Sequence, residues 1–83
     1  MAQVDIYTKN YCSFCHRAKD LLKIKNVNFT EYDVTHNREL EEQMRTRSGR
    51  RSVPQIFIDD QHIGGCDELF ALDEKGKLDS LLG

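Results

Sequence analysis

The sequence lacks a long apolar run, an excess of positive charge and more than one proline, and it has only three cysteines among 83 residues. Because a membrane-spanning helix needs about 20 consecutive apolar residues, we expect no membrane partner. The net charge of -2 lacks the basic excess that phosphate binding requires, so we expect no nucleic-acid partner. The first ten residues, MAQVDIYTKN, lack the basic and apolar segments of an export signal, which predicts a cytoplasmic protein.

The small number of cysteines also limits what they can do. An odd number leaves at least one thiol unpaired in any disulfide framework, and a reducing cytosol disfavours such frameworks. We therefore expect the cysteines to act in catalysis or in metal binding. A hydrophobic content of 39% with 31% charged residues is typical of a soluble globular domain, and the length of 83 residues predicts a single domain over residues 1–83.

Residue patterning predicts a mixed α/β chain. Alternating or β-branched stretches predict strands at residues 4–8, 29–34, 54–58 and 62–64. Apolar residues at three- and four-residue steps predict helices at residues 13–25, between Asn37 and Gly49, and at 67–74, with a last helical turn over 78–82. The order is βαβ, then α, then a ββ hairpin that turns at residues 59–61, then α. The first two strands should be parallel and joined by a right-handed crossover.

The string CSFCH at residues 12–16 can be interpreted in three ways. As letters it is the attachment pattern of a c-type haem, but that chemistry is usual in exported chains, and here the string follows a strand and opens a helix. The second interpretation is a zinc site with four ligands, namely Cys12, Cys15, His62 and Cys66. The two pairs of ligands lie farther apart in the chain than is usual in a small zinc module. The third interpretation is a redox dithiol.

The redox dithiol agrees best with the predicted structure. Cys12 lies between a strand and a helix, where unpaired backbone N–H groups and the positive end of the helix dipole favour the thiolate, which is the reactive form. Cys15 lies one turn further on, begins the apolar stripe of the helix and should be the more buried of the two. Cys12 is therefore expected to attack and Cys15 to resolve. Lys9 either adds a positive charge near Cys12 or is an ordinary solvated lysine.

Two long blocks of the chain resemble the small bacterial dithiol glutaredoxins. The block YTKNYCSFCHRAKDLL is similar to the active-site block of that family, and SGRRSVPQIFIDDQHIGGCDELFALDEKGKLDSLL is similar to its glutathione-binding half. The resemblance implies the thioredoxin fold, a four-stranded mixed sheet flanked by helices. It also implies a monomeric enzyme that uses glutathione to reduce protein disulfides and glutathione mixed disulfides, with ribonucleotide reductase as one acceptor.

The resemblance further implies a set of glutathione-binding residues, namely Lys9, Phe14, Ser52, Val53, Pro54, Gly65, Cys66 and Asp67. In the family the Val53-Pro54 bond is cis, and the Val53 backbone can pair with the cysteinyl residue of glutathione; without the family, a lone proline is better interpreted as a strand starter. The start of the helix that follows Gly65 offers N–H groups to a carboxylate. Asp67 would meet the γ-glutamyl amine, cap that helix, or do both. Cys66 is interpreted as a small apolar filler rather than as a second reactive thiol.

The chain departs from the commonest family pattern at three positions. Ser13 and Phe14 stand where proline and tyrosine are usual between the cysteines, and Ser52 stands where threonine is usual. A serine after the first cysteine is associated with family members that bridge two chains through a [2Fe–2S] cluster, which would be ligated by Cys12 of each chain and by two glutathione thiols. We keep this dimeric, cluster-binding form as the alternative function, although Lys9 and the second thiol favour redox work.

A local basic run follows the second predicted helix; it comprises Arg45, Arg47, Arg50 and Arg51. We interpret it as the solvated end of a helix. Attraction of an anionic tripeptide is the alternative.

Overall fold

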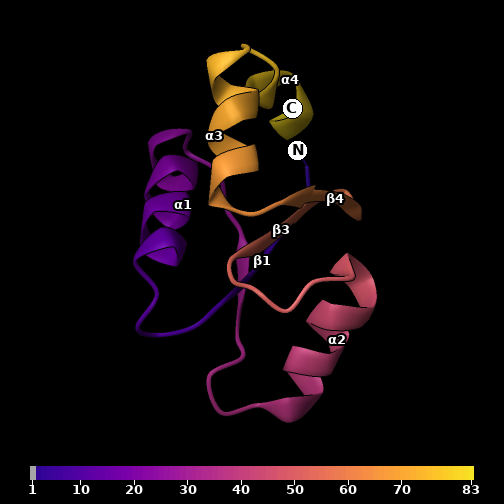
Figure 1. The fold of residues 1–83 in the computed structure, drawn as a ribbon. Helices are drawn as coiled ribbons and strands as arrows, with labels where there is room; N and C mark the ends of the chain where they lie inside the picture. The colour runs from indigo at the N-terminus through magenta and orange to yellow at the C-terminus, as the bar shows by residue number, and fades with distance from the viewer. Residues whose placement is uncertain (1) are drawn as a thin grey trace.

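A four-stranded mixed sheet forms the centre of the fold (Figure 1). The computed structural model describes residues 2–83; Met1, with which the predicted domain begins, lies outside them. The elements are β1 Val4–Thr8, α1 Ser13–Ile24, β2 Thr30–Asp33, α2 Arg38–Ser48, β3 Gln55–Ile58, β4 Gln61–Gly64, α3 Cys66–Glu74 and α4 Leu78–Leu82. The strand order is β2-β1-β3-β4, with β1 parallel to β2 and the other two pairs antiparallel. The predicted element order and the mixed sheet are thereby confirmed.

Helices cover both faces of this sheet. Figure 1 shows α1 and α3 side by side, with α4 next to α3, and α2 apart from them on the other side of the sheet. Because side chains alternate along a strand, Ile6 and Ile56 pack against α1 and α3, whereas Tyr7 and Phe57 pack toward α2. The central strand β1 is buried along its whole length, as expected of a strand covered on both faces.

The helix caps agree with the predictions for α2 but not for α3. Asn37 caps α2 by accepting a hydrogen bond from the Leu40 N–H at 3.0 Å, and Gly49 ends this helix with a left-handed φ of 71°. Asp67, which we had considered as the cap of α3, lies inside that helix. The capping position is occupied by Gly65, and the helix begins one residue earlier than predicted, at Cys66.

The interpretation of the basic run as a solvated helix end is wrong for Arg47. The guanidinium carbon of Arg47 lies 3.9 Å from the centre of the Phe57 ring. One guanidinium nitrogen donates to the Tyr7 hydroxyl at 2.9 Å and to the Asp5 carboxylate at 3.3 Å. Arg47 therefore ties α2 to the sheet through stacking and charge-assisted hydrogen bonds.

Between residues 2 and 83, no helix is both long and apolar enough to span a bilayer.

Burial along α1 generates a prediction about stability. Leu22 is fully buried, whereas Ile24, two residues further along the same helix, is 75% exposed. Leu22→Ala should lower the free energy of unfolding by about 2–5 kcal/mol, because it removes buried apolar contacts and leaves a cavity. The matched control Ile24→Ala should change it by less than about 0.5 kcal/mol. Denaturant unfolding measures both values; equal losses in the two variants would contradict the placement of α1.

Candidate active site

The sulfur of Cys12 caps the first helix. Cys12 has extended backbone angles and precedes α1, and its Sγ accepts a hydrogen bond from the Cys15 N–H at 3.1 Å. The sulfur thus takes the place that a serine or aspartate oxygen takes in an ordinary N-cap. It faces unpaired N–H groups and the positive end of the helix dipole, which stabilise negative charge on a group placed there. The geometry suits a thiolate nucleophile.

Cys15 is the protected member of the pair. Its side chain is fully buried, whereas Cys12 is partly exposed, as the apolar stripe of the helix predicts. Burial raises the pKa of the Cys15 thiol to about 12, with a further contribution from its hydrogen bond with Cys12. A backbone hydrogen bond from Lys9 and the charge of Lys19 act in the opposite direction but are outweighed. Cys15 therefore stays protonated at neutral pH.

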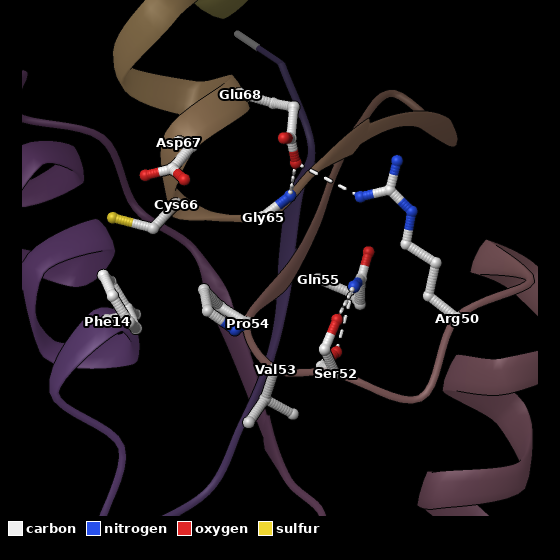
Figure 2. Close-up of a pocket in the computed structure, with 10 residues that line it drawn as sticks. All are labelled: Phe14, Arg50, Ser52, Val53, Pro54, Gln55, Gly65, Cys66, Asp67 and Glu68. Atoms are coloured by element: carbon white, nitrogen blue, oxygen red, sulfur yellow. Dashed lines mark hydrogen bonds and ion pairs between the residues drawn. The ribbon is translucent and has the colours of Figure 1, made fainter.

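A cavity of about 230 Å³ opens between the starts of two helices and the loop before β3 (Figure 2). Its lining brings together segments that lie far apart in the sequence: Phe14, Arg50, Ser52, Val53, Pro54, Gln55, Gly65, Cys66, Asp67 and Glu68. The predicted binding residues are in this lining with the exception of Lys9, which contacts Cys15 through its backbone instead.

The Val53-Pro54 segment connects this cavity to Cys12. The bond between the two residues is cis, as the resemblance implies. The Val53 carbonyl oxygen lies 3.8 Å from the Cys12 sulfur. Among the described residues, no hydrogen-bond acceptor is found for the Val53 N–H, since Val53 lies just before β3 and outside the sheet. A backbone donor is thus left open beside the sulfur.

The start of α3 forms the opposite wall. Glu68 accepts hydrogen bonds from the Gly65 N–H and, at 3.2 Å, from the Arg50 guanidinium (Figure 2). Gly64 has a φ of +121°, and a Cβ there would lie 2.5 Å from a Glu68 carboxylate oxygen, so only glycine is accommodated. Gly65 approaches Pro54 closely, because a Cβ on it would lie 3.3 Å from the Pro54 carbonyl oxygen. The two walls are therefore in close contact at this edge.

The environment of Cys66 supports its interpretation as a filler. The residue is buried and belongs to the core cluster that also contains Leu69 and Leu22. Burial raises the pKa of its thiol, which the nearby positive charge of Arg17 only partly offsets. A protonated, buried thiol is a poor nucleophile.

The haem and zinc interpretations gain no support from the geometry. Cys15 is fully buried and His16 is exposed. Across residues 2–83, no three His, Cys, Asp or Glu side chains lie close enough together to hold a metal ion. His62, one of the four candidate zinc ligands, instead pairs with Gln55 at 2.7 Å.

Sequence reasoning missed two residues of the cavity lining, Gln55 and Glu68, and considered a ligand role for Arg50 only as the alternative to a solvated helix end. Arg50 had been assigned to a solvated helix end, but it lines the cavity and pairs with Glu68. Glu68 lies three residues after Gly65, which is the spacing of a capping box and could have been recognised. Gln55 is polar yet fully buried, and a lone glutamine in an apolar strand is a weaker signal.

Comparisons with known proteins identify close relatives of this chain. The family model described as Glutaredoxin matches residues 4–63. Glutaredoxin 3 of Escherichia coli strain K12 is 60% identical over 82 residues, which are 99% of this chain and 99% of that protein. The solution structure of glutaredoxin from Brucella melitensis has a TM-score of 0.86 at 52% identity, covering 99% of this chain and 89% of that one. The crystal structure of the buckwheat glutaredoxin–glutathione complex has a TM-score of 0.88 at 27% identity, and the match covers 98% of this chain and 76% of that one.

The unequal environments of the three thiols predict their order of alkylation. At neutral pH, brief treatment of the reduced protein with iodoacetamide should modify Cys12 first, because Cys15 and Cys66 are buried and their thiols stay protonated. Since the pKa of the Cys15 thiol is raised, its reaction should stay slow until the solution is strongly alkaline. Peptide mass spectrometry locates the adducts. An adduct on Cys66 that forms as fast as the one on Cys12 would show that this environment is described incorrectly.

Proposed function

Because the chain belongs to the glutaredoxin family and is a thiol–disulfide oxidoreductase, we propose that it takes its electrons from glutathione. Its substrates would be glutathione mixed disulfides and protein disulfides. The observation that carries this proposal is the cavity beside Cys12. One of its walls carries the open Val53 N–H, and the start of α3 forms the other wall. A solved relative, the buckwheat protein, is a complex with glutathione.

Glutathione is an extended tripeptide with two carboxylates, one amine and a central thiol, and the cavity offers partners for its cysteinyl backbone, its γ-glutamyl carboxylate and its amine. The Val53 N–H and C=O can pair with the cysteinyl backbone as in a short β-bridge, which brings the ligand's sulfur toward Cys12. The start of α3 offers the N–H groups of Cys66 and Asp67 to the γ-glutamyl carboxylate, and the exposed Asp67 carboxylate can meet the amine.

The remaining lining residues would complete the site. Phe14 is half exposed on the first turn of α1 and can cover the bound tripeptide. Ser52 and Pro54 shape the wall on either side of Val53, and Gly65 permits the close approach of the two walls. Lys9 remains proposed as a source of positive charge near Cys12.

With a glutathionylated substrate, Cys12 alone would suffice. Its thiolate attacks the glutathione sulfur, the substrate's thiolate leaves, and glutathione is held on Cys12 as a mixed disulfide. A second glutathione thiolate then attacks the bound glutathione sulfur. Oxidised glutathione leaves, and the Cys12 thiolate is restored. No step requires Cys15.

With a protein disulfide, Cys15 would complete the reaction. Cys12 attacks one substrate sulfur and forms a mixed disulfide, and Cys15 then attacks the Cys12 sulfur, so that the substrate leaves with both of its sulfurs reduced and a Cys12–Cys15 disulfide forms. Two glutathione molecules reduce that disulfide in turn and leave as oxidised glutathione. The negative charge of Cys12 is among the causes that raise the pKa of the Cys15 thiol. Formation of the mixed disulfide removes that charge, which makes the Cys15 thiol more acidic at the moment when it must attack.

The wider setting of the enzyme is proposed on the resemblance alone. We take residues 1–83 as one glutaredoxin domain that acts as a cytoplasmic monomer, with ribonucleotide reductase among its protein acceptors.

Replacing each thiol separately tests this division of labour. Cys12→Ser should abolish turnover of both substrate classes, because it removes the nucleophile. Cys15→Ser should lose protein-disulfide reduction but keep removal of glutathione from a glutathionylated peptide. Steady-state assays with each substrate, coupled to glutathione reductase, measure both activities. If the two variants are equally inactive toward the glutathionylated peptide, the one-thiol route is wrong.

A second candidate function is the binding of a [2Fe–2S] cluster, and the position of Ser13 favours it. Ser13 is exposed and is the first residue of α1, directly after Cys12, where it keeps a backbone N–H that proline would remove and a φ angle that proline would lock. Because Cys15 is fully buried and the described residues contain no cluster of three metal ligands, Cys12 is the accessible thiol that one chain could supply. The residues therefore fit only a shared site, completed by a second chain and two glutathione thiols. A cluster held there would occupy the Cys12 sulfur and stop thiol–disulfide exchange.

Anaerobic reconstitution with iron, sulfide and glutathione decides this second candidate. A brown dimer that bleaches when glutathione is removed, and that fails to form with Ser13→Pro, is the expected outcome for a cluster-binding protein. Visible absorption and gel filtration provide the measurement. A colourless monomer from both the wild type and Ser13→Pro would remove this function.

A further inference from the structure

A chain of hydrogen bonds runs from the edge of the sheet to the Ser52-Val53-Pro54 segment. Gln55 is the first residue of β3 and is fully buried. Its side-chain nitrogen donates to the Ser52 carbonyl oxygen at 2.9 Å and to the Ser52 hydroxyl at 3.2 Å (Figure 2). Its side-chain oxygen lies 2.7 Å from Nε2 of His62 on β4. The Gln55 amide thus joins His62 to the loop that carries Val53.

The chemistry of the groups determines the direction of every bond in this chain. A backbone carbonyl can only accept, so the Gln55 amide must turn its nitrogen toward Ser52. Its oxygen must then face His62, and because an amide oxygen can only accept, His62 must carry a hydrogen on Nε2. Burial lowers the pKa of His62, with the charge of Arg50 acting in the same direction, which favours the neutral ring. The hydrogen bonds therefore require a hydrogen on Nε2 of His62.

This chain holds a segment on which the site depends. Residues 50–54 lie between α2 and β3 and belong to no strand or helix. Yet the Val53 carbonyl lies 3.8 Å from the Cys12 sulfur, and the Pro54 carbonyl lies against Gly65 at the start of α3. A small shift of Ser52 would therefore move the Val53 backbone relative to the nucleophile. The Phe57 ring, with its centre 5.1 Å from that of the His62 ring, holds the imidazole in place.

We propose that His62 and Gln55 are positioning residues that set the orientation of the Val53 backbone for glutathione. Neither needs to touch the reacting sulfurs: Gln55 acts on Ser52, and His62 acts on Gln55. The proposal rests on the proposed glutathione function, since it assigns the chain of hydrogen bonds to that ligand. Loss of the donor on His62 would leave the buried Gln55 oxygen unpaired and free the amide to rotate away from Ser52.

Two nearly isosteric substitutions isolate the donor. In His62→Gln the amide nitrogen reaches about the place of Nε2, whereas in His62→Asn the shorter side chain places its donor near Nδ1. His62→Asn should raise KM for a glutathionylated peptide about tenfold and change kcat less than about twofold, as the loss of one hydrogen bond to a buried group predicts. His62→Gln should restore KM to near the wild-type value. Gln61→Leu, on the exposed neighbouring residue of β4, is the control and should change neither constant.

The contrast between the two variants separates positioning from general destabilisation. Both His62→Asn and His62→Gln should remain fully folded at the assay temperature and should show the same rate of Cys12 alkylation by iodoacetamide, while KM differs. An unchanged KM in His62→Asn, or an equal rise in both variants, would overturn the proposal.

A second measurement tests the hydrogen bonds without any ligand. Long-range ¹H–¹⁵N NMR correlations of the wild-type protein report the tautomer of His62, and the Nε2–H form is the expected result. The Nδ1–H form would overturn the proposal, because it cannot donate to Gln55. If the wild type reduces protein disulfides but does not act on glutathionylated peptide, the glutathione function fails, and the tautomer still decides whether the hydrogen bonds exist.

Discussion

The hydrogen bond from the Cys15 N–H to the Cys12 sulfur is the contact on which the site depends. It makes the nucleophile part of a helix cap, so the position of the sulfur follows from the position of α1. That helix is anchored in turn by its buried face, with Ala18, Leu21 and Leu22 against the sheet. Packing of the core thus places the partly exposed Cys12 sulfur next to the Val53 carbonyl. The same burial that anchors the helix keeps the Cys15 thiol protonated.

The sheet order explains how one cavity can be lined by three distant segments. Because β1 lies beside β3 and β3 beside β4, the ends of these strands bring together the start of α1, the loop before β3 and the start of α3. Two polar pairs then stabilise the walls: Glu68 with Arg50 on one side, and Gln55 with Ser52 on the other. The proposed site therefore combines a sulfur held in a helix cap with backbone groups whose orientation we attribute to buried side chains.

Most of the helices and strands could be predicted from the sequence, because their patterns of apolar and capping residues are strong. The alternation of Val4–Thr8, the apolar stripe of α1 and the Asn37 and Gly49 caps all act within a few residues. Long-range polar pairs could not be predicted. In the sequence, Arg47 cannot be distinguished from any other arginine near the end of a helix. Its partners Phe57, Tyr7 and Asp5 lie on two strands that only the folded sheet brings close to it. Similarly, Arg50 lines the cavity where it donates a hydrogen bond to Glu68, which is 18 residues away in the chain.

The central claim is that glutathione lies along the Val53 backbone with its γ-glutamyl end at the start of α3. A crystal structure of Cys15→Ser, glutathionylated on Cys12, tests it most directly. We expect the Val53 N–H and C=O to pair with the cysteinyl residue of the tripeptide, and the γ-glutamyl carboxylate to lie at the N–H groups of Cys66 and Asp67. A glutathione that projects into solvent from Cys12, without contact to Val53, would contradict the account.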